Sequence, residues 1–113
     1  PFNVNMLAQA AALKALALED RLEERRRQNR EGRRQLYAGL DGLGIGYEPT
    51  QSNFMLVEVG GLGVAAADVP EELMKRGVIV RPGGPLSCPG YIRVSVGTTE
   101  ENTFFLEKLA ELK

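Results

Sequence analysis

Gly77-Val78-Ile79-Val80-Arg81-Pro82 is a β-branched run that ends in a proline, and a loop rich in glycine and proline separates it from a second run, Tyr91-Ile92-Arg93-Val94-Ser95-Val96-Gly97-Thr98. β-Branched residues favour strands because their side chains pack well on a pleated surface. We therefore predict strands over residues 78–81 and 91–96. The apolar pattern of residues 53–59 predicts a third strand, and Tyr47-Glu48 a short fourth one.

Each of the two runs carries one arginine, Arg81 or Arg93. An arginine inside a strand is costly to desolvate unless a negative group meets it. The planar donors of a guanidinium match two oxygens of a carboxylate or phosphate at once. The two arginines therefore favour an anion-binding site, although spacing alone also fits solvent-facing residues or internal salt-bridge partners.

Helices are predicted on both sides of these strands. Residues 5–18 are rich in alanine and leucine, which predicts a buried or half-buried helix after an extended lead-in over residues 1–5. A longer helix is predicted from Glu19 or Asp20 to Leu43, with glycines at its end.

Two further helices carry the spacing of a capping box, in which the first residue and the residue three positions later cap each other. Asp68 and Glu71 predict such a box at the start of a short helix over residues 69–76. Thr98 and Glu101 predict another at the start of the closing helix. These elements together predict a two-layer α+β domain, with a small, mostly antiparallel sheet and helices packed on one face.

Composition and length predict one folded domain over residues 1–113, because 43% hydrophobic and 26% charged residues are typical of globular chains. A single cysteine, Cys88, excludes an intramolecular disulfide and a four-cysteine zinc site. No apolar run is long enough to cross a bilayer, so we expect a soluble, cytoplasmic protein that does not enter a membrane.

Histidine is absent, which removes the commonest general base and the commonest metal ligand. The remaining ionisable residues do not form a recognisable pair of nucleophile and base. We therefore predict no metal site and no catalytic residue in this chain.

Seven arginines lie between residues 21 and 34, against three glutamates. This excess raises the hypothesis of nucleic-acid binding. However, the arginines point around the whole helix, no stacking aromatic residues lie among them, and glutamates three or four positions away are available as partners. We interpret the segment as a solvated helix face and expect no nucleic-acid partner, which agrees with the net charge of −1.

Four segments together resemble histidinol-phosphate aminotransferases, which belong to the fold-type I enzymes that use pyridoxal phosphate. In chain order they are Pro1-Phe2-Asn3-Val4-Asn5 before an alanine-rich helix, Ser52-Asn53-Phe54-Met55-Leu56-Val57, Gly77-Val78-Ile79-Val80-Arg81-Pro82, and Ile92-Arg93-Val94-Ser95-Val96-Gly97-Thr98-Thr99-Glu100-Glu101-Asn102. The match runs along essentially the whole chain, in the right order.

The resemblance covers only the carboxy-terminal small domain of such an enzyme. It implies that a large domain, absent from this chain, carries the Schiff-base lysine and holds pyridoxal phosphate. The Ser-x-x-Lys segment of the family is missing, and the lysines lie in helical or terminal contexts without it: Lys14, Lys75, Lys108 and Lys113. We therefore expect no cofactor in this chain and no activity when it is isolated. The complete enzyme, by resemblance a homodimer, would transfer an amino group between histidinol phosphate and 2-oxoglutarate in histidine biosynthesis.

The same resemblance implies roles for individual residues. Arg93 is the family arginine that grips the anionic group of the substrate, and Arg81 is a second arginine that shares its phosphate. Two guanidinium groups suit a dianion better than one does. Asn53, which opens an apolar strand, is a further substrate-binding candidate, although an asparagine in that place also satisfies its own turn.

Other functions stay open. An aromatic aminotransferase or a threonine-phosphate decarboxylase would use a similar small domain with a phosphorylated or plain amino-acid substrate. A stand-alone anion-binding module would bind phosphate esters in isolation and lose them in Arg93→Ala. A nucleic-acid binder would instead show salt-dependent retention of DNA or RNA that does not depend on Arg93.

Overall fold

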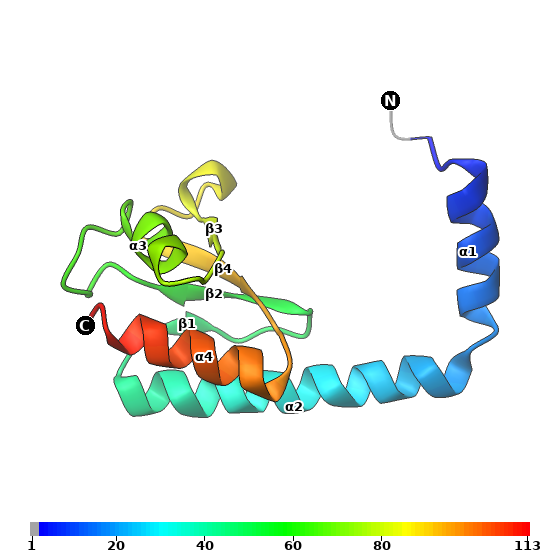
Figure 1. Cartoon of the computed structure of the whole chain (residues 1–113), viewed down its shortest axis with the longest axis horizontal. Coiled ribbons are helices and arrows are strands. Elements are labelled where there is room, and N and C mark those ends of the chain that lie inside the picture. Colours follow the sequence, from blue (N-terminus) through cyan, green and yellow to red (C-terminus); the bar gives the residue numbers. More distant parts are fainter. Residues whose placement is uncertain (1–2) are drawn as a thin grey trace.

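Residues 3–113, which the computed structural model describes, begin with two helices and continue as a small sheet with further helices (Figure 1). The elements in chain order are α1 (Met6–Leu16), α2 (Glu19–Leu43), β1 (Tyr47–Glu48), β2 (Phe54–Glu58), α3 (Val69–Lys75), β3 (Arg81–Pro82), the 3-10 turn η1 (Gly84–Leu86), β4 (Tyr91–Ser95) and α4 (Thr99–Ala110). The predicted extended lead-in lies partly outside the described residues, because it includes Pro1 and Phe2. Asn5 does have an extended backbone, and its side chain caps α1 by accepting a hydrogen bond from the Ala8 backbone N–H.

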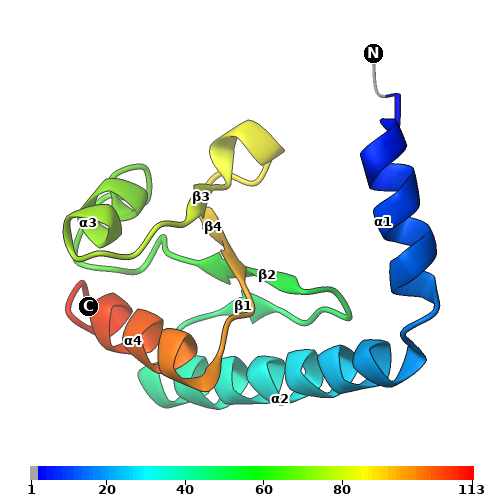
Figure 2. The ribbon, with the colours of Figure 1, turned by 45° about the vertical axis from the view of Figure 1, so that its right-hand side comes forward.

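The four strands form one antiparallel sheet in the order β1-β2-β4-β3. The two central strands face the core with alternate residues, as the pleat requires. In the register, Met55 lies opposite Val94 and Val57 opposite Ile92, and all four side chains are at most 5% exposed. Helices α2 and α4 lie side by side beneath this face (Figure 2). The predicted two-layer α+β fold is confirmed.

Two glycines of α2 allow close packing against the end of the chain. A Cβ atom at Gly32 would lie 2.5 Å from Val96 Cγ1, and one at Gly39 would clash with the side chain of Leu106. Between and beside them, Leu36 and Leu40 are fully buried. The helix thus accepts the cost of two interior glycines, roughly 1 kcal/mol each, in exchange for close contact with β4 and α4.

The predicted ends of two helices are confirmed. Thr98 has an extended backbone and accepts a hydrogen bond from the Glu101 N–H, while Glu101 accepts one from the Thr98 N–H at 2.8 Å. Gly44 ends α2 in the left-handed region, with φ of 65°. The capping box predicted at Asp68 is wrong, because φ of −91° and ψ of −17° already make Asp68 helical and its carboxylate caps no N–H group.

The strand predicted over residues 78–81 is also wrong in its extent, because β3 pairs with β4 only at Arg81 and Pro82. The Val78 N–H donates to Leu73 O at 2.9 Å and so ties the start of this run to the end of α3. Ile79 is 87% exposed. The first residues of the β-branched run therefore follow the end of α3, and only Arg81 and Pro82 pair with the sheet.

Helix α1 corrects a further prediction, because none of its residues is buried. It projects away from the sheet beyond the amino-terminal end of α2 (Figures 1 and 2). Large apolar side chains stay exposed on it, among them Leu7, Leu13 and Leu16 at 72–84%. The alanine and leucine pattern correctly predicted a helix with apolar surface, but nothing in residues 3–113 covers that surface. No helix in this range is long and apolar enough for a bilayer crossing.

Candidate anion-binding site

The two strand arginines are direct neighbours across the sheet. Arg81 on β3 and Arg93 on β4 are partners in the antiparallel register. Because residues that lie directly opposite share one face, both belong to the face turned away from Leu36 and the rest of the core. Like charges in this arrangement repel each other and destabilise a sheet. The structure thus makes the two predicted residues neighbours on the open face, where Arg81 is exposed, as the solvent-facing alternative expects, and Arg93 is half-buried.

Neither arginine is neutralised within the part of the chain that the structure describes. No carboxylate in residues 3–113 forms an ion pair with Arg81 or Arg93, whereas Arg26, Arg27 and Arg76 each pair with at least one. The alternative of internal salt-bridge partners, which the sequence left open, therefore does not hold for the described residues. Positive charge on this face is left available for an external anion.

Arg93 instead contacts an aromatic ring. Its guanidinium carbon lies 4.9 Å from the centre of the Phe54 ring, which is within the range of a cation–π interaction. Phe54 begins β2 and is 38% exposed. Leu56, the direct neighbour of Arg93 across the sheet, extends the apolar surface beside it. Arg93 is therefore half-buried against the apolar side chains of Phe54 and Leu56.

The carboxylates on the same face lie toward Tyr91. Glu58 is the direct partner of Tyr91 across the sheet. The charge of Glu58, followed by desolvation and the nearby Glu48, raises the pKa of Tyr91 above its ordinary value. Negative charge is thus concentrated near Tyr91, which lies two residues before Arg93 on the same strand.

The loop between β3 and β4 fixes the register of the arginine pair. The Gly83 N–H donates to Tyr91 O at 2.8 Å, and Gly83 O accepts from the Cys88 N–H at 3.0 Å. A Cβ atom at Gly83 would clash with the backbone oxygens of Cys88 and Tyr91. Only glycine fits at position 83, where the two ends of the loop cross closely.

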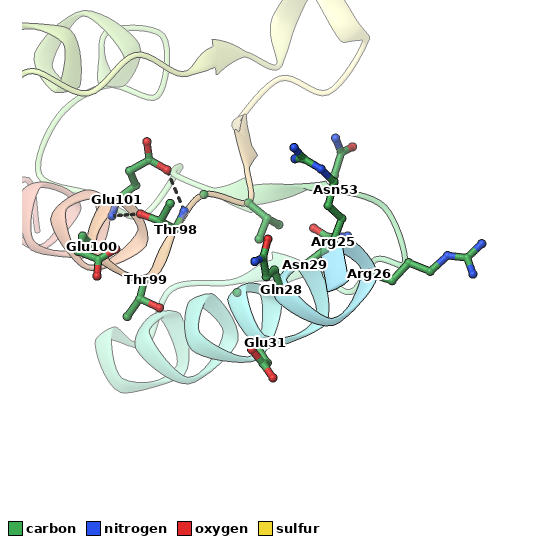
Figure 3. Close-up of a pocket in the computed structure, with 13 residues that line it drawn as sticks. Arg25, Arg26, Gln28, Asn29, Glu31, Asn53, Thr98, Thr99, Glu100 and Glu101 are labelled. Carbon is green, nitrogen blue, oxygen red and sulfur yellow. Dashed lines mark hydrogen bonds between the residues drawn. The ribbon is translucent and has the colours of Figure 1, made fainter. Parts of the chain in front are cut away.

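Asn53 directly precedes β2 and is exposed. It lines a hollow of about 700 Å³ together with Arg25 and Asn29 of α2 and the start of α4 (Figure 3). Arg81 and Arg93 do not line that hollow. The substrate-binding role of Asn53 stays a prediction.

The sequence reasoning missed a residue that supports the site. Arg33, assigned to a solvated helix face, is only 8% exposed. It donates to Ser52 O at 3.0 Å and to Gln51 O at 3.4 Å, and Asn29 also donates to Ser52 O. The spacing of Asn29, Arg33 and Tyr37 by four residues was the available signal, because it places three polar side chains on one face of α2.

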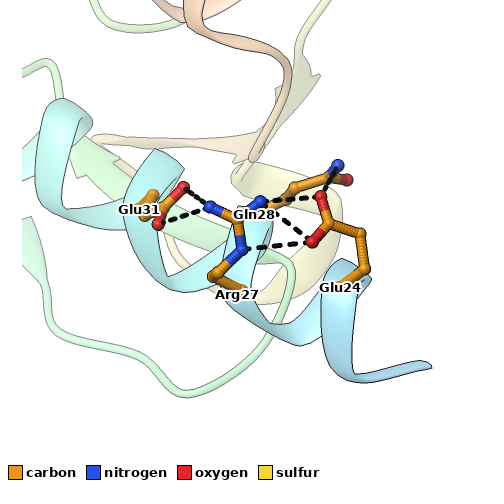
Figure 4. Close-up of polar contacts among 4 residues, drawn as sticks. All are labelled: Glu24, Arg27, Gln28 and Glu31. Carbon is orange, nitrogen blue, oxygen red and sulfur yellow. Dashed lines mark hydrogen bonds and ion pairs between the residues drawn. The ribbon is translucent and has the colours of Figure 1, made fainter. Parts of the chain in front are cut away.

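The other arginines of this segment behave as predicted. Arg27 bonds Glu24 at 2.8 Å and Glu31 at 3.1 Å on the exposed surface of α2 (Figure 4). The hydrogen bond from Arg27 lowers the pKa of Glu24, and the bond to Glu24 raises the pKa of Arg27. These local pairs support the interpretation of a solvated helix face.

The described residues do not form a site for pyridoxal phosphate or for a metal ion. Lys75 pairs with Glu71 and Glu72, Lys108 pairs with Glu111, and both lie on helices. Lys14 lies on the exposed helix α1. No lysine of residues 3–113 belongs to the sheet face that carries Arg93, and the same residues contain no cluster of three or more metal-ligating side chains.

Comparisons with known proteins identify the family and agree with the fold. The family model described as aminotransferase class I and II matches residues 1–109. A histidinol-phosphate aminotransferase of Symbiobacterium thermophilum is 46% identical over 109 residues, which cover 96% of this chain and 29% of that protein. Histidinol-phosphate aminotransferase 2 of Pseudomonas fluorescens is 46% identical over 112 residues, covering 99% of this chain and 30% of that protein.

A solved structure gives the same fold. The histidinol-phosphate aminotransferase of Clostridium acetobutylicum superposes with a TM-score of 0.81 over 98% of this chain and 34% of that one, at 22% identity. The chain spans about 30% of the length of the curated relatives it matches.

Proposed function

The chain belongs to the class I and II aminotransferases, and we propose that it binds the anionic group of the substrate, through Arg93 and Arg81, within a complete enzyme of that family. One observation carries this proposal. The two arginines are direct partners across β3 and β4, and no carboxylate of residues 3–113 pairs with either. An anion that accepts hydrogen bonds from both guanidinium groups would offset the repulsion between them.

The anion that we propose is the phosphate of histidinol phosphate. The relatives from Symbiobacterium thermophilum and Pseudomonas fluorescens carry that substrate in their names and share 46% of their matched residues with this chain. A phosphate ester carries close to two negative charges at neutral pH, which suits two guanidinium groups. The amino group would pass to 2-oxoglutarate, in the cytoplasm.

Pyridoxal phosphate would supply the amino-transfer chemistry, as it does in aminotransferases of this class. The described residues do not fit it, because their lysines lie on exposed or ion-paired positions away from Arg93. We therefore assign the cofactor to a large domain outside this chain. The exposed apolar side chains of α1, such as Leu7 and Leu13, would then pack against that domain.

The contribution of this chain is to bind and orient the substrate. Arg93 and Arg81 would fix the substrate at its phosphate end and so hold its amino group at a constant place relative to the cofactor. The apolar surface of Phe54 and Leu56 would lie beneath the bound substrate and exclude water from the ion pairs, which strengthens them.

A chimeric enzyme tests this function without knowledge of what precedes Pro1. The 109 residues of the chain that match the Symbiobacterium thermophilum enzyme replace the corresponding segment of that enzyme. We expect the chimera to transaminate histidinol phosphate. Arg93→Ala should lower kcat/KM by about 10²- to 10³-fold and Arg81→Ala by about 10- to 100-fold, because one guanidinium then remains for the phosphate.

Arg34→Ala is the matched control, since Arg34 is an exposed arginine of α2 and should leave kcat/KM unchanged. Phenylalanine and threonine phosphate serve as competing substrates. An active chimera in which Arg93→Ala keeps the parental kcat/KM would show that the anion binds elsewhere. A preference for phenylalanine or threonine phosphate would assign the chain to another member of the superfamily.

A further inference from the structure

An exposed aromatic residue stands beside Arg93 and has no role in the core. Phe54 is 38% exposed on the open face of the sheet, and its ring centre lies 4.9 Å from the guanidinium carbon of Arg93. We propose that Phe54 is a positioning residue, whose ring holds the guanidinium of Arg93 in place for the substrate anion. The inference rests on the proposed function, because it gives Arg93 the anion as its ligand.

An aromatic partner solves a problem that a carboxylate partner would create. An arginine side chain has several rotatable bonds and becomes ordered only when something holds it. A carboxylate would order it but would also occupy its N–H donors and cancel its charge. The face of an aromatic ring attracts the cation while offering no hydrogen-bond acceptor of comparable strength. Phe54 thus orders Arg93 and leaves its donors free for an anion.

The backbone that carries Phe54 is held from both sides. Ser52 Oγ donates to Phe54 O at 3.1 Å, and Ser52 O accepts hydrogen bonds from Asn29 and Arg33 of α2. On the other side, Asn53 O accepts from the Val96 N–H at 2.9 Å. The ring therefore stands on a segment fixed by the long helix and by the neighbouring strand, as a positioning element requires.

The competing explanation is that Phe54 only provides apolar contact to a neighbouring domain. That role would respond to side-chain volume, and leucine would replace phenylalanine with little loss. The positioning role needs an aromatic face, so tyrosine would preserve it and leucine would not. Kinetic constants separate the two, since weaker gripping of the anion in both ground state and transition state raises KM and leaves kcat unchanged.

The experiment uses the chimeric enzyme with three variants. We expect Phe54→Leu to raise KM for histidinol phosphate about 3- to 30-fold with kcat nearly unchanged. Phe54→Tyr should keep KM within about twofold of the parental value. Phe104→Leu is the matched control. Phe104 is 42% exposed, and its ring centre lies 5.6 Å from Lys108 Nζ, so this variant removes an exposed ring from a different cation and leaves the contact with Arg93 intact.

A second measurement tests the contact without activity. In the 113-residue chain, the ring current of Phe54 should shift the side-chain protons of Arg93 upfield in the NMR spectrum, and Phe54→Leu should return them to ordinary positions. The Arg93→Lys variant assigns the resonances. Unshifted Arg93 protons in the parent chain would overturn the proposal, whatever the variants do.

The outcomes also separate this inference from the proposed function. If Arg93→Ala leaves an active chimera unaffected, the anion-binding function fails. If Arg93→Ala is strongly impaired while Phe54→Leu keeps the parental KM, only the positioning role of Phe54 fails.

Discussion

Replacing Gly32 by alanine tests the close packing of α2 against the end of β4 and the start of α4. A Cβ atom there would lie 2.5 Å from Val96 Cγ1, 3.1 Å from Asn102 Nδ2 and 3.3 Å from Gly97 O. Carbon atoms in ordinary contact are about 3.5–4.0 Å apart, so Val96 would have to retreat by about 1 Å. Asn102 gives little room, because it is 2% exposed and bonds both polar groups of Gly97.

Two opposing effects set the magnitude. Alanine improves helix propensity by about 1 kcal/mol relative to glycine. Overpacking a filled site costs about 1–3 kcal/mol. Gly42 separates these effects, because it belongs to the same helix and a Cβ atom there would meet nothing within 4 Å. Gly42→Ala should therefore stabilise the chain by about 0.5–1 kcal/mol, and Gly32→Ala should fall about 1–3 kcal/mol below it.

Urea unfolding of both variants, followed by far-ultraviolet circular dichroism, measures this difference. The free energy of unfolding is extrapolated linearly to zero urea for each chain. A Gly32→Ala variant as stable as Gly42→Ala would refute the reasoning, because it would mean that Val96 and Asn102 yield without cost and that the contact with α2 is loose.

Two further perturbations probe the support of the site and the surface charges. Arg33→Met should lower the free energy of unfolding by about 1–3 kcal/mol in urea denaturation, because Gln51 O and Ser52 O lose a buried donor. The control Arg34→Met should change the free energy of unfolding by less than about 0.5 kcal/mol. Equal effects of the two substitutions would contradict the buried role of Arg33. Acid should also destabilise the chain, because hydrogen bonds from Lys75 and then Arg76 lower the pKa of Glu72, and Lys108 lowers that of Glu111. A carboxylate with a lowered folded pKa contributes stability above its ordinary pKa of 4.5, and this contribution disappears as the pH falls through the folded value. Unfolding followed from pH 6 to pH 3 should therefore show declining stability below about pH 4.5, with a shallower decline in Glu72→Gln; identical slopes would mean that Glu72 does not contribute.

The sequence predicted elements whose signals are local. The Thr98 and Glu101 capping box, the left-handed Gly44 and the pairing of Glu24 with Arg27 all depend on residues at most four positions apart. The arginine pair was also foreseen, because a glycine-proline loop joins the two runs of strand-forming residues that carry Arg81 and Arg93.

The failures concern contacts that residue spacing does not reveal, some between neighbours in the chain and others between distant residues. The run at residues 78–81 has strand propensity throughout, but the bond from Val78 N–H to Leu73 O ends a helix there instead. In the sequence, Arg33 resembles its exposed neighbours on α2. Its burial depends on the segment before β2, where Ser52 O, 19 positions away, accepts its hydrogen bond. The contact of Phe54 with Arg93 joins residues far apart in the chain. Helix α1 has an apolar pattern whose burial depends on something outside residues 3–113.

The open face of the sheet breaks local rules that the rest of the chain obeys. Elsewhere, arginines such as Arg27 and Arg76 meet carboxylates, and exposed unpaired ones such as Arg34 stay fully hydrated at little cost. Arg93 is half-buried beside an exposed ring, directly opposite a second positive charge. A folded protein keeps such an unfavourable arrangement where function requires it, and the sheet can hold it because its opposite face packs fully buried residues against α2 and α4. The proposed function would account for this arrangement, because an anion bound between the two arginines would offset their mutual repulsion.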